Sequence, residues 1–165
     1  MNEALPLPVV EQTLVQHDMA YTALECTPEL ADTAAFCEHY GVALEQAANT
    51  ILVASRKVEP TRYAVCVVLG TSRLDVNQKV CELLEVKKAS FADAETTMRL
   101  TGMLIGGVTA VGIGDLPIYV DGAVMRQSDV VMGGGNRSSK IRLAPQELLK
   151  LPNVAVIEGL ARPRE

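Results

Sequence analysis

Two apolar segments of strand length, separated by a short polar turn, limit the fold of this chain more than any other feature. Residues 50–55 (TILVAS) and 63–69 (YAVCVVL) are nearly continuous aliphatic runs, and residues 56–61 (RKVEPT) between them are mostly polar and contain Pro60. Runs of this length that are rich in β-branched residues are typical of strands buried on both faces. We therefore expect a hairpin at the centre of a sheet, with other elements covering each face.

Signals for helices and for further strands alternate irregularly along the rest of the chain. Helices are expected where apolar residues recur at helical spacing after a capping residue or before a glycine, over residues 9–16, 33–40, 76–84, 91–100 and 146–150. Further strands are expected over residues 21–25, 117–121, 130–132, 139–143 and 154–157. This order lacks regular βαβ alternation, so it indicates an α+β fold in which a mixed sheet curls into a barrel-like core.

Length, composition and charge restrict the class of protein. A chain of 165 residues with 48% apolar residues is expected to form one domain, residues 1–165. The formal net charge of −5 argues against nonspecific binding to nucleic acid or to an anionic membrane. It does not argue against docking of one nucleic-acid end in a basic pocket. The N-terminus has no signal-peptide pattern, and the tract 103–114 is too short and too rich in glycine to span a bilayer. We expect a cytoplasmic protein.

Metal and nucleophile chemistry find little support in the sequence. The four cysteines, Cys26, Cys37, Cys66 and Cys81, are never closer than eleven positions apart, so no CxxC pair or metal knuckle is present. The two histidines, His17 and His39, lie outside any recognisable nucleophile motif. We expect no metal and no cofactor.

Two glycine-rich stretches are the remaining candidates for a site. They are residues 102–114 and residues 133–140, and a local basic cluster, Arg137, Lys140 and Arg142, begins within the second. Glycine lets backbone N–H groups approach an anionic ligand closely, but neither stretch has the spacing of a phosphate-binding loop. From the residues alone, the glycines favour turns and bulges over a ligand cradle. The basic cluster can equally be interpreted as a solvent-exposed strand edge or as a site of phosphate contact.

The order of several short motifs resembles the YbaK family, also known as the prolyl-tRNA synthetase-associated editing domain. The segments are residues 41–50, 74–80, 87–93, 101–112, 116–121 and 130–143, and the resemblance extends over residues 31–157. It implies a compact mixed β-barrel core with surrounding helices. It also implies hydrolysis of the ester that joins a wrong small amino acid, of the Cys, Pro or Ala type, to the 3′ end of a tRNA. The implied partners are the tRNA acceptor end and a synthetase, without metal or cofactor.

Mapping the family pattern onto this chain identifies the expected site residues. The catalytic loop falls on Gly106, Gly107, Thr109 and Gly112, and the strand-initial lysine of the family falls on Asn49. The expected substrate-binding positions are Ala110, Asp121, Gly133, Gly134, Arg137 and Lys140.

Two departures occur at positions that the family uses for its chemistry. Asn49 replaces the lysine, and Ala110 replaces a proline. Asparagine donates hydrogen bonds without charge, so the departure at position 49 predicts altered or weakened hydrolysis. Arg137 or Lys140 would have to supply the charge from another segment. The sequence therefore leaves two functions open, an aminoacyl-tRNA deacylase and an inactive module that binds a small ligand or a tRNA 3′ end.

Overall fold

The expected hairpin forms the centre of a five-stranded sheet in the computed structural model, which describes residues 6–164. The strands lie in the order β5 (Ala89–Phe91), β2 (Ala48–Ser55), β3 (Tyr63–Leu69), β6 (Ile118–Asp121) and β9 (Val154–Ile157). β2 pairs with β3 and with β5 in antiparallel register, whereas β3–β6 and β6–β9 are parallel. The hairpin prediction and the mixed character of the sheet are thus confirmed.

The remaining strands form two smaller sheets. A three-stranded antiparallel sheet has the order β1 (Thr22–Glu25), β8 (Ser139–Leu143) and β7 (Val130–Gly133), and β4 (Ser72–Leu74) pairs with β10 (Ala161–Pro163). The barrel prediction is not confirmed, because the sheets do not close on one another. Closure requires a continuous ladder of hydrogen bonds. Within residues 6–164, one isolated bridge, between Ala47 and Val131, joins the two larger sheets.

Short helices connect and cover the sheets. The α-helices are α1 (Pro8–Gln16), α2 (Thr33–Tyr40), α3 (Cys81–Leu84), α4 (Ala94–Thr101) and α5 (Gly122–Met125). Residues Val76–Val80 form a π-helical segment that leads into α3, and Pro28–Leu30, Leu44–Gln46 and Pro145–Lys150 are 3-10 turns. As predicted, the Asp75 side chain caps the segment before α3 by accepting a hydrogen bond from the Gln78 N–H.

The expected start of the fourth helix at Phe91 was wrong. Phe91 pairs with Val53 as the last residue of β5. α4 begins three residues later, because the Asp93 carboxylate accepts a hydrogen bond from the Thr96 N–H at 2.8 Å and caps the helix there. A strand pairing in the tertiary structure therefore outweighs the local helix signal.

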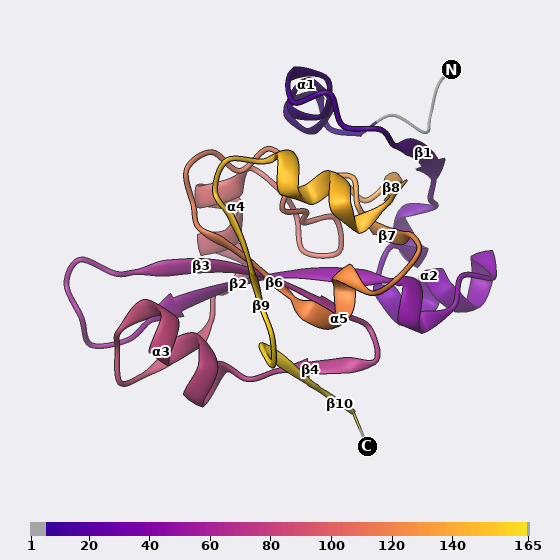
Figure 1. Cartoon of the computed structure of the whole chain (residues 1–165). Helices are drawn as coiled ribbons and strands as arrows, with labels where there is room; N and C mark the ends of the chain where they lie inside the picture. The colour runs from indigo at the N-terminus through magenta and orange to yellow at the C-terminus, as the bar shows by residue number, and fades with distance from the viewer. Residues whose placement is uncertain (1–5, 165) are drawn as a thin grey trace.

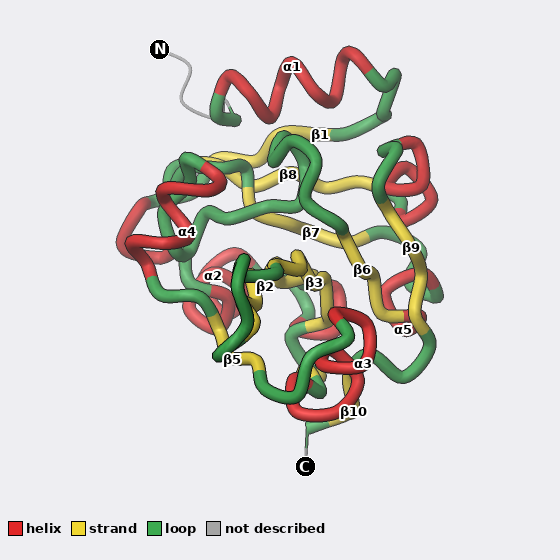
Figure 2. The backbone as a smooth tube through the Cα atoms, turned by 90° about the vertical axis from the view of Figure 1, so that its left-hand side faces the viewer, coloured by secondary structure: helices red, strands yellow, loops and turns green. Residues whose placement is uncertain are grey.

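The elements stack in layers on both faces of the five-stranded sheet (Figure 1). Figure 2 shows α1 outermost, then the β1–β8–β7 sheet, then the β2–β3 hairpin, with α3 and β10 on the far side. The larger core lies between the two main sheets and includes Leu52, Val67, Met132 and Ile141, all buried. A second core lies between the hairpin and α3. Both faces of β2 and β3 are thus covered, as their apolar runs require.

The start of β2 is the least enclosed part of the central sheet. β5 pairs with β2 only at residues 53–55, so the same edge of β2 at residues 49–51 has no strand partner among the described residues. The loop after α4, the N-terminal end of α2 and strands β7 and β8 surround this open edge.

Candidate functional site

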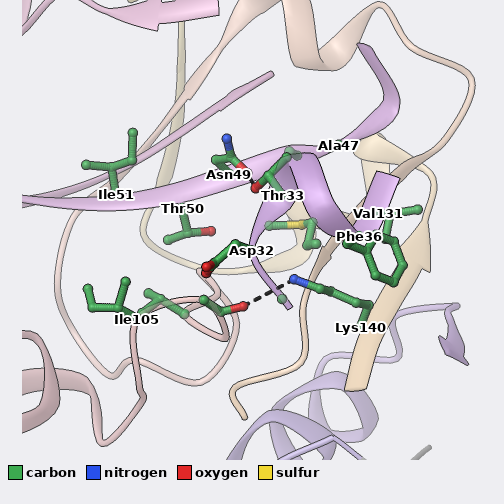
Figure 3. Close-up of a pocket in the computed structure, with 15 residues that line it drawn as sticks. Asp32, Thr33, Phe36, Ala47, Asn49, Thr50, Ile51, Ile105, Val131 and Lys140 are labelled. Atoms are coloured by element: carbon green, nitrogen blue, oxygen red, sulfur yellow. Dashed lines mark hydrogen bonds between the residues drawn. The ribbon is translucent and has the colours of Figure 1, made fainter. Parts of the chain in front are cut away.

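A cavity of about 260 Å³ opens at this unpaired edge. Its wall comes from α2, the start of β2, the loop after α4, and strands β7 and β8, and Figure 3 shows how the side chains converge. The lining residues are Asp32, Thr33, Phe36, Ala47, Ala48, Asn49, Thr50, Ile51, Ile105, Gly106, Val108, Val131, Met132, Gly133 and Lys140.

Lys140 supplies a buried cation to this cavity. It lies on β8 and is only 7% exposed. Its ammonium donates hydrogen bonds to the Ala31 carbonyl at 2.6 Å and to the Gly106 carbonyl at 3.2 Å (Figure 3 draws the pocket side chains around it). The nitrogen also lies 5.3 Å from the centroid of the Phe36 ring. Since an ammonium has three N–H donors, one remains for a ligand.

Burial lowers the pKa of Lys140 below its ordinary value of 10.5. The nearby thiols of Cys26 and Cys37 and the Asp32 carboxylate act in the opposite direction, and Arg137 adds to the lowering. No carboxylate of the described residues lies within ion-pair distance of Lys140. A buried cation without a carboxylate partner is costly, and such residues concentrate at functional sites.

Asn49 and Thr50 lie on β2 across the cavity from Lys140, and Figure 3 shows their side chains on opposite sides of the strand. The Thr33 hydroxyl donates a hydrogen bond to the Asn49 side-chain oxygen at 2.5 Å, which fixes the amide and leaves its NH₂ group as a donor. The Thr50 hydroxyl is buried and has no hydrogen-bond partner among the described residues. Figure 3 shows this oxygen directed into the cavity. A buried polar atom without a partner is costly, so it marks a position where a bound ligand or water would be stabilised.

The two glycine-rich stretches pack against each other beside the cavity. A side chain at Gly107 would lie 2.3 Å from the Asn136 carbonyl oxygen, and one at Gly133 would lie 2.5 Å from that of Val108. The Gly135 N–H donates to the Gly107 carbonyl at 2.7 Å. The absence of side chains at Gly107 and Gly133 allows the two backbones to approach closely. These two glycines therefore serve the packing of the loops against each other.

Arg137 holds the rim of the cavity together. Its guanidinium donates to the Pro28 and Ile105 carbonyls and pairs with Asp32 at 3.2 Å. It crosses directly over Gly106, where a Cβ would lie 1.9 Å from the Arg137 Nη1 atom, and Gly106 has φ +94°. Arg137 therefore links α2 to the loop after α4 and positions the Gly106 carbonyl that Lys140 contacts.

The structure brings together some of the residues expected from the sequence and separates others. Asn49, Gly106, Gly133 and Lys140 line the cavity, and Arg137 lies at its rim. The others do not line it: Gly107, Thr109, Ala110, Gly112, Asp121 and Gly134.

Those other positions have identifiable structural surroundings. Thr109 and Ala110 are buried, at 0% and 1% exposure. Gly112 lies against the α1 backbone at Val9. Asp121 is at the end of β6, where burial raises the pKa of its carboxyl and the Ala161 N–H donates to it at 3.3 Å.

The lining residues that sequence reasoning missed include Asp32, Thr33, Phe36, Thr50 and Ile105. Thr50 follows Asn49 directly, and a polar residue inside an apolar run was the available signal. Nothing in the sequence indicated that the first turn of α2 reaches the start of β2.

Groups that could act as nucleophile or metal ligand lie elsewhere. Burial raises the pKa of the Cys26 and Cys37 thiols, which keeps them protonated and poorly nucleophilic. In residues 6–164 no cluster of three His, Cys, Asp or Glu side chains is suited to a metal ion. Nor does that part of the chain contain a helix long and apolar enough to cross a membrane. The cavity thus offers the Lys140 ammonium and the Thr50 hydroxyl as groups that can bind and polarise a carbonyl group.

Comparison with known proteins identifies the family of this chain. The model of the aminoacyl-tRNA editing domain matches residues 27–151. An Enterococcus faecalis protein named "Putative Cys-tRNA(Pro)/Cys-tRNA(Cys) deacylase EbsC" is 24% identical over 141 residues, which is 84% of each chain.

Solved structures share the fold. A structure described as "a putative trans-editing enzyme for prolyl tRNA synthetase" superposes with a TM-score of 0.79 at 24% identity, covering 95% of this chain and 96% of that one. The hypothetical protein APE2540 gives a TM-score of 0.82 at 22% identity, with 93% and 99% coverage. The family model covers most of the chain and every residue identified above as lining the cavity. This chain therefore belongs to the aminoacyl-tRNA editing domain family.

Proposed function

We propose that this protein hydrolyses the ester bond between a small amino acid and the 3′ end of a mischarged tRNA. The observation that carries the proposal is the buried ammonium of Lys140 in a cavity of about 260 Å³ beside the unpartnered Thr50 hydroxyl. Such a cavity has room for an amino acid of the Cys, Ala or Pro type and part of a ribose, but is smaller than most drug-sized pockets.

The chemistry needs no nucleophile from the protein. Water attacks the ester carbonyl carbon, and the carbonyl oxygen becomes an oxyanion in the tetrahedral intermediate. The bond to the ribose oxygen then breaks, and the proton from water passes to that oxygen through the neighbouring ribose hydroxyl. The products are the free amino acid and the uncharged tRNA.

Lys140 would stabilise the oxyanion with its third N–H donor. Hydrogen bonds to developing negative charge accelerate such reactions most when the donor is fixed before the reaction begins. Lys140 meets this condition, because the Ala31 and Gly106 carbonyls and the Phe36 ring hold its ammonium in place. In this chain the cation comes from β8, across the cavity from Asn49.

The other polar groups would orient the substrate. The Asn49 amide, held by Thr33, and the Thr50 hydroxyl would hydrogen-bond the ester and the ribose. The Asp32 carboxylate at the rim is suited to the α-ammonium group of the amino acid. The amides of Gly106 and Val108 make no hydrogen bond with any described residue and are available as further donors.

A panel of mischarged tRNAs tests the proposal. The purified protein should release cysteine, alanine or proline from at least one non-cognate tRNA faster than the spontaneous rate, and should leave correctly charged tRNA intact.

The alternative is a module that binds the tRNA 3′ end without hydrolysis. Retention of every amino acid across the panel, together with protection of the ester from spontaneous hydrolysis, would establish that function and refute the first.

A further inference from the structure

A second hollow, away from the candidate site, is lined by cations. It measures about 440 Å³ and is lined by Arg56, Lys57, Lys87 and Lys88 together with Asn77 and Ala89. All four basic side chains are exposed. We call Arg56, Lys57, Lys87 and Lys88 the basic patch.

The antiparallel pairing of β5 with β2 creates this patch. Ser55, the last residue of β2, lies opposite Ala89, the first residue of β5. The Arg56 N–H then donates to the Lys88 carbonyl at 2.9 Å, which continues the pairing beyond the strands. Two basic pairs about thirty positions apart in the sequence are therefore fixed side by side.

The charge of the basic patch is not neutralised by the described residues. Arg126, Arg137, Arg142, Lys150 and Arg162 each form an ion pair with a carboxylate. None of the four patch residues forms one with a described residue, and no acidic side chain lines the hollow. In a protein with a formal net charge of −5, four adjacent unpaired cations form a local site for a polyanion.

The basic patch and the candidate site lie along the same edge of the central sheet. The cavity occupies this edge at residues 49–51 of β2, β5 covers it at residues 53–55, and the patch follows at residue 56. Figure 1 shows the turn that follows β2 at the opposite end of the hairpin from α2. At a rise of about 3.3 Å per residue, the seven steps from Asn49 to Arg56 span about 23 Å.

An exposed aromatic ring lies between the cavity and the basic patch. Phe91 pairs with Val53, midway between the cavity and the basic patch, and is 61% exposed. Cations that follow a nucleic-acid backbone, interrupted by an exposed aromatic ring for stacking, are the usual elements of a single-strand binding track.

We propose that the basic patch and Phe91 bind the RNA backbone of a tRNA whose 3′ end occupies the cavity. The proposal rests on the proposed function for the identity of the RNA. A single aminoacyl nucleotide is too short to reach from the cavity to the patch, so the patch would distinguish a whole tRNA from a minimal substrate.

Binding of uncharged tRNA tests the proposal independently of hydrolysis. The measurement is the Kd by fluorescence anisotropy at several salt concentrations, for wild type and for Lys87→Gln/Lys88→Gln. Each phosphate contact contributes about 0.7–0.9 to the slope of log K against log salt, so the double variant should lower the slope by about 1.5 and weaken binding at least tenfold at low salt. The matched control, Arg126→Gln/Arg164→Gln, removes the same charge at exposed positions outside the patch and should change neither.

Phe91→Ala separates stacking from charge. It should weaken tRNA binding by about tenfold and leave the salt slope unchanged. In hydrolysis, Lys87→Gln/Lys88→Gln and Phe91→Ala should each raise KM for mischarged tRNA and leave KM for a single 3′-aminoacylated adenosine unchanged. An unaltered Kd and slope in Lys87→Gln/Lys88→Gln, or an equal loss in the control variant, would overturn the proposal even where the protein hydrolyses both substrates. If tRNA binding depends on the basic patch but neither substrate is hydrolysed, the role of the patch would be supported and the proposed deacylase function would be rejected.

Discussion

Replacing Lys140 by methionine should remove most of the hydrolytic activity while leaving the protein folded. Methionine matches the length of the lysine side chain and keeps a favourable contact with the Phe36 ring. The substitution deletes one charged donor from the cavity and releases the Ala31 and Gly106 carbonyls. A hydrogen bond to a charged group contributes about 1.5–3 kcal/mol. Loss of that stabilisation in the transition state corresponds to about a 10- to 150-fold lower kcat/KM.

The assay compares kcat/KM for the best mischarged tRNA in wild type and in Lys140→Met, after thermal unfolding has shown that both are folded. A second variant, Lys140→Met/Asn49→Lys, moves the cation to the opposite wall. Its kcat/KM should be roughly tenfold higher than that of Lys140→Met, because a charge is restored in the cavity, although from a different direction.

Asn49→Lys alone places two ammonium groups in one small cavity. Like charges that share one partly buried cavity repel each other, so this single variant should lose activity rather than gain it. Wild-type kcat/KM in folded Lys140→Met would refute the role of the buried cation. Higher activity in Asn49→Lys than in wild type would refute the argument that Lys140 already supplies the charge.

Further predictions concern pH and the loops around the cavity. Because burial lowers the pKa of Lys140 below 10.5, kcat/KM corrected for spontaneous hydrolysis should fall with rising pH at a midpoint below 10.5, and this fall should be absent in Lys140→Met. Between the folded pKa and 10.5 the unfolded chain binds the additional proton, so the unfolding free energy of wild type should rise with pH relative to Lys140→Met, as denaturant titrations would show. Gly106→Ala should lower the unfolding free energy by about 1–3 kcal/mol, because its Cβ would meet Arg137 at a φ of +94°, whereas Gly114→Ala has free space at φ +74° and reports the backbone strain alone. Asp121→Ala should destabilise the protein by about 1–3 kcal/mol in denaturant, because the Ala161 N–H loses its acceptor, while kcat/KM stays within a factor of two; a large loss of kcat/KM would instead assign Asp121 to the substrate.

The sequence by itself determined the elements whose signals are local. Residues 50–55 and 63–69 form a buried hairpin because long aliphatic runs favour strands that are covered on both faces. This preference can be recognised without knowing which elements provide the cover. Asp75 caps a helical segment because capping depends on residues three positions apart. The order of the six short motifs also sufficed to identify the family, since that inference needs no geometry.

Only the tertiary structure decided which residues meet at the cavity. Lys140 and Asn49 are ninety-one positions apart, and their approach depends on how β8 and β7 pack over the start of β2, which no local pattern records. The same holds for the glycines: Gly106 and Gly133 border the cavity, whereas Thr109 and Ala110 in the same motif turn into the core. Spacing along the chain specifies neighbours within an element, but the identity of neighbours between elements depends on the summed packing of the whole molecule. For this reason the sequence could offer Lys140 only as a possible source of charge, and the tertiary structure places its ammonium in the cavity that Asn49 also lines.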